Sequence, residues 1–151
     1  MSKTFFMETT KISPEQTVGE IQQVLCRYGA AAIQLEYESG GIKAVKFIVD
    51  VDGQKVPFLL PCRWKEVHTA LLNRMRKARE SREEEYILQA KRIAWRQIYR
   101  WIEAQLALVE TNMVRIEEVF MPYLVVNKKG ETLYEQMKAV EFKGQLLEAP
   151  K

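Results

Sequence analysis

The stretch from Glu83 to Glu110, EEEYILQAKRIAWRQIYRWIEAQLALVE, is the most strongly patterned part of the chain. At about 100° per residue, its apolar side chains gather on one side of a helix. The apolar side comprises Ile87, Ala90, Ala94, Ile98, Trp101, Ile102, Leu108 and Val109. Most other positions hold good helix formers, and three glutamates at the start complement the helix dipole. The pattern predicts one amphipathic helix around which the rest of the fold is organised.

Three arginines, Arg92, Arg96 and Arg100, recur every four residues on the opposite side of this helix. Trp95 and Tyr99 accompany them, and we expect both near the helix surface. The alternative is that these two aromatic residues belong to the core or to an interface. An arginine side bordered by aromatic residues is therefore the first candidate for a binding surface.

Lys91 and Gln105 fit neither side of the helix. Both project toward the apolar half, where a polar group without a partner is costly. We expect either that their stems are buried at the edge of the apolar side or that they bond a partner from elsewhere in the chain.

The residues before Cys62 predict a helix followed by three strands. Ser13, Pro14 and Gln16 form a helix start of the capping-box type, and Gly29 is a typical C-terminal cap, so the helix spans about residues 14 to 28. Alternating apolar residues then predict an antiparallel meander with one apolar face. Asp52-Gly53 indicates a two-residue hairpin turn.

Between Cys62 and Met121 there is no glycine and no proline. One unbroken helix over this span would be about 90 Å long, which is too long for a small compact domain. We therefore expect an elbow near Glu80 to Glu85, with one helix before it and the central helix after it.

These patterns predict an α+β fold: an N-terminal helix, a three-stranded antiparallel meander, and a long helical half packed on one face of the sheet. Residues 1–140 form a single domain in this interpretation. Its parts are the helix and meander (1–62), the helical half (63–121) and a turn with a short helix (122–140), and residues 141–151 form a flexible tail.

The charge of the chain is unevenly distributed. The formal net charge is +3, but residues 63–100 contain eleven Lys or Arg against five Glu. Such asymmetry points to an anionic partner, although a solvated helical face explains it equally well. We find no signal peptide and no apolar run long enough for a membrane span, and both cysteines suit free thiols. We therefore expect a cytoplasmic protein, in the host cytoplasm if it is viral, with no membrane contact.

Residues suited to catalysis or metal binding are sparse. His68 is the single histidine, and the two cysteines, Cys26 and Cys62, have no spacing typical of a zinc site. Asp50 and Asp52 fit a hairpin turn better than a metal site. The sequence predicts a non-enzymatic protein with no catalytic residues, no metal and no cofactor.

Basic and aromatic residues of the helical half supply the main functional hypothesis, which is nucleic-acid binding to single strands or without strong sequence preference. Cations follow phosphates, and exposed aromatic rings stack on unpaired bases. The candidate residues are Arg74, Arg76, Lys77, Arg79, Arg82, Arg92, Trp95, Arg96, Tyr99 and Arg100. Whether the partner is DNA or RNA stays open.

The alternative hypothesis is a protein-interaction module that acts as an inhibitor or adaptor of a host or viral protein. Trp95, Tyr99 and Trp101, together with arginines, have the composition of interface hot spots. Self-association through the helices of residues 63–79 and 86–110 would make the protein a homo-oligomer.

Two resemblances accompany these patterns. The order helix, meander, helix is similar to that of double-stranded RNA-binding domains, but their Gly-x-Ser-Lys-Lys helix start is missing, so their function is not carried over. Several segments also resemble a group of short proteins of bacteriophages and integrated bacterial elements. The similar segments include Ala44-Val45-Lys46-Phe47, Ala94-Trp95-Arg96, Trp101 to Ala107, Phe120 to Leu124 and Thr132-Leu133-Tyr134. This resemblance implies a viral or mobile-element origin and transfers no activity and no binding residue.

Overall fold

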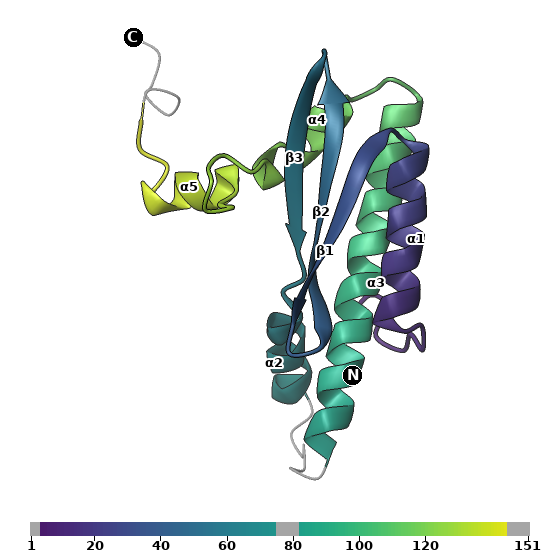
Figure 1. The fold of residues 1–151 in the computed structure, drawn as a ribbon. Helices are drawn as coiled ribbons and strands as arrows, with labels where there is room; N and C mark the ends of the chain where they lie inside the picture. The colour runs from purple at the N-terminus through teal and green to yellow at the C-terminus, as the bar shows by residue number, and fades with distance from the viewer. Residues whose placement is uncertain (1–3, 75–81, 145–151) are drawn as a thin grey trace.

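The computed structural model describes residues 4–74 and 82–144 and has the predicted α+β architecture (Figure 1). In chain order the elements are α1 (Pro14–Arg27), β1 (Ala30–Glu38), β2 (Gly41–Val51), β3 (Gln54–Pro61), α2 (Trp64–Arg74), α3 (Glu83–Glu110), α4 (Ile116–Phe120), the short 3₁₀ helix η2 (Met121–Tyr123) and α5 (Leu133–Ala139). The central helix α3 has the bounds that its sequence pattern predicts.

Helix α1 begins as predicted from its capping residues. The Ser13 hydroxyl accepts a hydrogen bond from the Gln16 N–H at 3.1 Å, and Gly29 follows the helix with a φ of 102°. Residues 4–12, which include Phe5 and Phe6, form no strand. This segment turns instead, because its backbone carbonyls accept hydrogen bonds from side chains of α3, such as Gln97 Nε2 at 2.8 Å from the Phe6 oxygen.

The three strands form one antiparallel sheet in the order β1-β2-β3. At the β2–β3 turn Asp52 and Gly53 both have positive φ, which matches the predicted hairpin type. The pairing of β1 with β2 slips once near the β1–β2 turn, where Glu36 pairs with Ala44 but Tyr37 pairs with Ile42. Lys43 is therefore an extra, bulged residue of β2.

Helices α1 and α3 lie side by side on one face of the sheet, and the main core lies between them and the strands (Figure 1). Phe47 of β2 stacks on Phe58 of β3, and Trp95 of α3 is buried in the same cluster. The predicted closure of the core by the apolar side of α3 is confirmed. Thr17 of α1 is also fully buried.

The helical half is divided as predicted. Helix α2 ends at Arg74 and α3 begins at Glu83, and the two helices pack against each other. Leu71 of α2 and Ala90 and Ile93 of α3 form a second, smaller core there. Residues 75–81, which include Glu80 and Ser81 of the predicted elbow, lie outside the described residues, and Glu83 to Glu85 of that elbow begin α3. A further short helix, α4, follows from Ile116 to Phe120.

Residues 124–144 form what we call the C-terminal arm. Its first residues pair with the edge of the sheet, because the Val125 N–H donates to the Pro57 oxygen at 2.9 Å. Helix α5 follows, capped at Thr132, and extends to one side of the sheet (Figure 1). Tyr134, Val140 and Phe142 of this arm are exposed. The final residues, 145–151, lie outside the described residues.

Candidate anion-binding site

The predicted arginine side of α3 is partly covered by other parts of the chain, most completely at Arg96. Arg96 is 6% exposed and pairs with Glu20 of α1. The same guanidinium lies 3.4 Å from the Thr17 hydroxyl and 4.6 Å from the centre of the Tyr99 ring. The expectation that Arg96 lies on an open binding surface is wrong, because α1 packs on this side and supplies a carboxylate. We call the group of Arg96, Glu20, Thr17 and Tyr99 the arginine seam.

Trp95 is only 1% exposed, so its predicted place at the surface is also wrong. At about 100° per residue it falls beside the apolar side, where α1 and the sheet enclose it. Tyr99 is half-buried between two guanidinium groups, since Arg100 lies 5.8 Å from its ring. Burial, followed by the charge of Glu103, raises the pKa of the Tyr99 hydroxyl. The buried Trp95 side chain therefore offers no free face for a base.

The remaining predicted residues differ in their surroundings. Arg100 is largely exposed and pairs with Glu103 at 2.7 Å, while Arg92 is half-buried and bonds Gln89 at 3.3 Å. Arg74 pairs with Glu8 of the N-terminal segment and lies over the Phe5 ring. Arg82 is exposed at the start of α3. Arg76, Lys77 and Arg79 lie outside the described residues.

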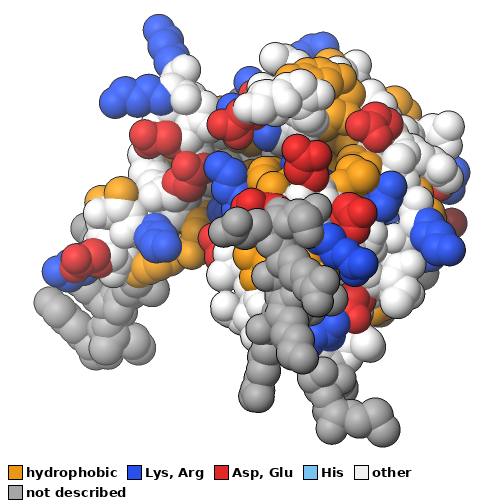
Figure 2. Space-filling model, turned by 90° about the horizontal axis from the view of Figure 1, so that it is seen from below, with side chains coloured by type: hydrophobic (Ala, Val, Ile, Leu, Met, Phe, Trp, Pro, Cys, Tyr) orange, Lys and Arg blue, Asp and Glu red, His pale blue; other side chains and the backbone are white. Residues whose placement is uncertain are grey.

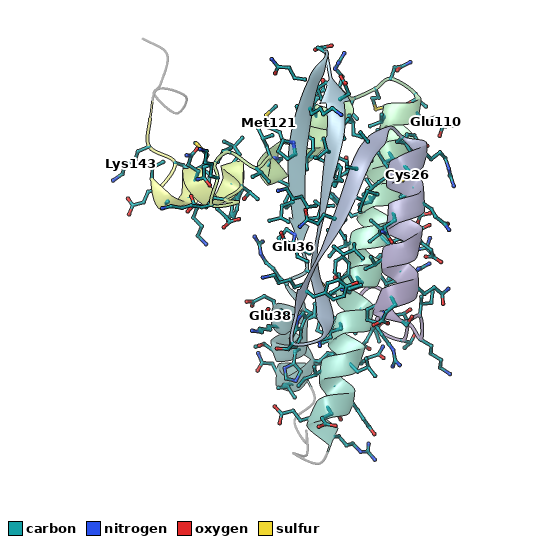
Figure 3. All side chains as sticks on the ribbon, in the orientation of Figure 1. Cys26, Glu36, Glu38, Glu110, Met121 and Lys143 are labelled. Carbon is teal, nitrogen blue, oxygen red and sulfur yellow. The ribbon has the colours of Figure 1, made fainter. Side chains whose placement is uncertain are left out.

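A different group of cations meets at the end of the sheet near α2. Lys43 of β2, Lys65 of α2 and Lys91 of α3 line a pocket of about 100 Å³. Trp64 forms part of its wall, and Glu38, Ser39, Gly41 and Ile42 complete it. Figure 3 shows Glu38 beside α2 at this end of β1. We call this site the lysine pocket.

The bulge in β2 explains how Lys43 comes to line this pocket. Strict alternation from Val45 would place residue 43 on the apolar face of the sheet. Because the bulge adds one residue, Ile42 takes that place opposite Tyr37 and packs against the core. The Lys43 carbonyl accepts the Cys62 N–H at 2.8 Å, which holds the bulge against the start of α2.

Lys91 is the residue that fitted neither side of α3 in the sequence pattern, and its ammonium group lies over the Trp64 ring at 4.8 Å from the ring centre. A Cβ added to Gly41 would lie 3.5 Å from Lys91 Nζ, so the ammonium also approaches the β1–β2 turn. The attraction between the cation and the ring's π-face offsets part of the cost of desolvating this lysine. Gln105, the other misfit, is half-buried.

The three lysines keep their charge available. Within residues 4–74 and 82–144, none of them forms an ion pair. Lys65 and Lys91 both lie within 6 Å of the Trp64 ring centre, at 5.9 and 4.8 Å. Three like charges repel one another, and an anion bound among them offsets this repulsion. A small oxyanion is the ligand that this arrangement favours.

Cys62 lies next to the lysine pocket but is not a reactive thiol. It is 7% exposed, and burial raises its pKa to about 12, against the smaller lowering effects of the Trp64 N–H and the Lys91 charge. Thiolate is the nucleophilic form, and it is scarce at neutral pH in a group with this pKa. Among the described residues no His, Cys, Asp and Glu side chains cluster so as to hold a metal ion.

The wider surface around α2 and the start of α3 has mixed charge. Figure 2, seen from this end, shows Lys and Arg side chains interspersed with Asp and Glu, with grey residues over part of the view. The visible surface is not one continuous basic face, so the concentration of lysines in a single pocket distinguishes that site from its surroundings.

Comparisons with known proteins do not add a family to this description. No family model matches the chain, and neither the curated proteins nor the solved structures include a match. Within the part of the chain that the structure describes, no helix is long and apolar enough to cross a membrane. The fold and the lysine pocket define the class: an α+β protein with a small electropositive site.

Only one of the three pocket lysines stood out as unusual in the sequence patterns. Lys91 stood out because a lysine on an apolar helix side needs an explanation. Lys43, Trp64 and Lys65 gave no such signal, since each is an ordinary residue of its own strand or helix. Their convergence depends on the bulge in β2 and on the packing of α2 against α3.

Proposed function

We propose that this chain is a non-enzymatic nucleic-acid-binding protein in which the lysine pocket makes the main phosphate contact. The observation that carries the proposal is that three lysines, none of which forms an ion pair within the described residues, line one pocket together with the half-buried Trp64. Ammonium groups bind phosphates, and a partly exposed aromatic ring beside them suits an unpaired base. The proposed ligands are therefore single strands, or nucleic acid that the protein binds without strong sequence preference. A cytoplasmic location and an origin in a bacteriophage or mobile element belong to the same proposal.

The described arginines support this choice less than the lysines do. Arg96, Arg74 and Arg100 each pair with a carboxylate from within the chain. A phosphate contact by any of them would require that pair to open or to share the cation. The lysines of the pocket have no such competitor among the described residues.

The test is a salt-titrated binding assay with labelled single-stranded oligonucleotides, DNA and RNA, followed by fluorescence anisotropy. Replacing Lys43, Lys65 and Lys91 by Gln should weaken binding at least tenfold and reduce the slope of log affinity against log salt by up to about 3. The matched control is Arg100→Gln, which removes an exposed cation that does not line the pocket. We expect it to change the slope by no more than about 1.

Two results would contradict the proposal. If no oligonucleotide binds to the unchanged protein at low salt, nucleic-acid binding is lost as a function. If binding is intact in the triple lysine variant but lost in an arginine variant, the lysine pocket is not the contact.

A protein-interaction role through the C-terminal arm is the second candidate. Tyr134 and Phe142 of the arm have ring centres 6.2 Å apart and are 39% and 41% exposed, and Val140 is 50% exposed. Met121, at the base of the arm, is also exposed (Figure 3). Exposed apolar groups of this kind are typical of interfaces, and here the proposed partner is a second copy of the chain.

Light scattering over a range of concentrations tests this candidate. The protein should associate as concentration rises, and Val140→Glu with Phe142→Glu should return it to a monomer. A monomer at every concentration would rule out self-association. The lysine-pocket variants serve as the control, because they alter charge without changing the arm.

A further inference from the structure

The lysine pocket is small for a nucleic-acid contact. Its volume is about 100 Å³, whereas pockets that enclose drug-sized ligands measure roughly 300–1,000 Å³. One water molecule needs about 10–15 Å³ on such a measure, so the pocket can hold a small oxyanion with a few waters. The three lysines of its lining make a phosphate group the part of a nucleic acid that this pocket suits best.

The walls of the pocket limit which phosphate can enter. The β1–β2 turn, the first residues of α2 and the Lys91 side chain of α3 approach it from different directions. An internal phosphodiester carries a sugar on each of two oxygens, and both must leave the pocket. A terminal phosphate carries a sugar on one oxygen only, so its other three oxygens are free to face the lysines.

The charges of the pocket favour the same ligand. Three lysines stand against the single acidic residue of the lining, Glu38. A terminal phosphate monoester carries about −1.5 to −2 charges at pH 7, whereas an internal phosphodiester carries one. Because attraction rises with the product of the charges, the monoester relieves the repulsion among the lysines more fully.

Trp64 adds an aromatic ring, on which a base can stack but inorganic phosphate cannot. Its side chain is half-buried and forms part of the pocket wall, so part of its indole ring is in contact with solvent. The pocket thus combines cations with an aromatic ring, and stacking of aromatic side chains on unpaired bases is largely independent of sequence.

We propose that the lysine pocket recognises the terminal phosphate of a single-stranded nucleic acid. This inference rests on the proposed function and names the part of the nucleic acid that the site selects. The protein then distinguishes phosphorylated ends from hydroxyl ends and from internal positions.

The experiment compares three oligonucleotides of one sequence and about 12 nucleotides. One has a 5′-phosphate, one a 3′-phosphate, and one hydroxyl groups at both ends. We expect one phosphorylated form to bind at least tenfold more tightly than the hydroxyl form at moderate salt, and the two phosphorylated arms identify which end is read. Lys91→Gln should abolish the preference, and Arg100→Gln should keep it.

The outcomes separate the two proposals. If all three oligonucleotides bind equally well, the terminal-phosphate inference is overturned and nucleic-acid binding stands. If none binds, both proposals fail together. Lys65→Gln is the second variant, because Lys65 is exposed and its replacement leaves the packing of α2 and α3 unchanged. A preference that persists in both lysine variants also overturns the inference.

Discussion

The arginine seam and the lysine pocket are both basic groups beside a tryptophan, yet their physical roles differ. In the seam, Arg96 has a carboxylate partner and Trp95 is enclosed in the core. In the pocket, Lys91 has only the Trp64 ring as a partner among the described residues, and Trp64 is half-buried. Basic residues that the fold already pairs stabilise the fold, whereas those left without carboxylates are available to a ligand. Composition alone does not separate the two cases.

Truncating the two tryptophans should give the largest difference in stability between the seam and the pocket. Trp95→Ala should lower the free energy of unfolding by about 3–5 kcal/mol, because it leaves a large cavity in the core. Trp64→Ala should cost only about 1–2 kcal/mol, because much less area is withdrawn from water. Urea unfolding followed by circular dichroism measures both. Equal losses would contradict the assignment of Trp64 to a site and Trp95 to the core.

The next largest effect concerns the seam's ion pair. Glu20→Ala should destabilise the protein by about 2–3 kcal/mol, because it leaves the buried Arg96 without its partner. We place the value below that for fully buried pairs, since the Glu20 side chain is 30% exposed. Glu103→Ala on α3 is the matched control, and breaking its exposed pair with Arg100 should cost under about 1 kcal/mol.

These contrasts also show which parts of the structure could be predicted from the sequence. The bounds of α3 were predictable because a long stretch without glycine or proline has a consistent apolar side. A helical pattern defines two sides but does not say what covers each. Arg96 pairs with Glu20, which lies 76 residues away in the chain, so its burial followed only from the packing of α1.

Lys91 was the only residue of the candidate site that the sequence pattern marked as unusual. Lys91 on the apolar side of α3 required a partner, but nothing in the pattern named Trp64 as that partner. Lys43 enters through a bulge, and a single slip in strand pairing leaves no trace in an alternating sequence. Sites assembled from separate elements depend on packing that local patterns do not contain.

Addition of inorganic phosphate gives the next smaller effect and tests the pocket directly. At ten times its dissociation constant, phosphate should add about 1.4 kcal/mol to the free energy of unfolding. Lys91→Met should lose this gain, while Glu20→Ala should keep it despite its lower starting stability. Thermal unfolding in phosphate and in chloride of matched ionic strength measures the difference. An equal gain in the Lys91 variant would show a general salt effect and no site.

The smallest effect concerns Cys62, which adjoins the pocket without taking part in it. Burial raises the pKa of its thiol from an ordinary value near 9.0 to about 12 in the folded state. Above pH 9 the unfolded chain loses the thiol proton while the folded chain keeps it, so stability falls as pH rises. At pH 9.5 this linkage should cost about 0.8 kcal/mol.

Cys62→Ala should remove that part of the decline between pH 8 and 9.5, and Cys26→Ala, which alters an exposed thiol, should retain it. Urea unfolding of the three proteins at the two pH values compares the declines, and an unchanged decline in Cys62→Ala would show that the thiol ionises as readily in the folded as in the unfolded chain.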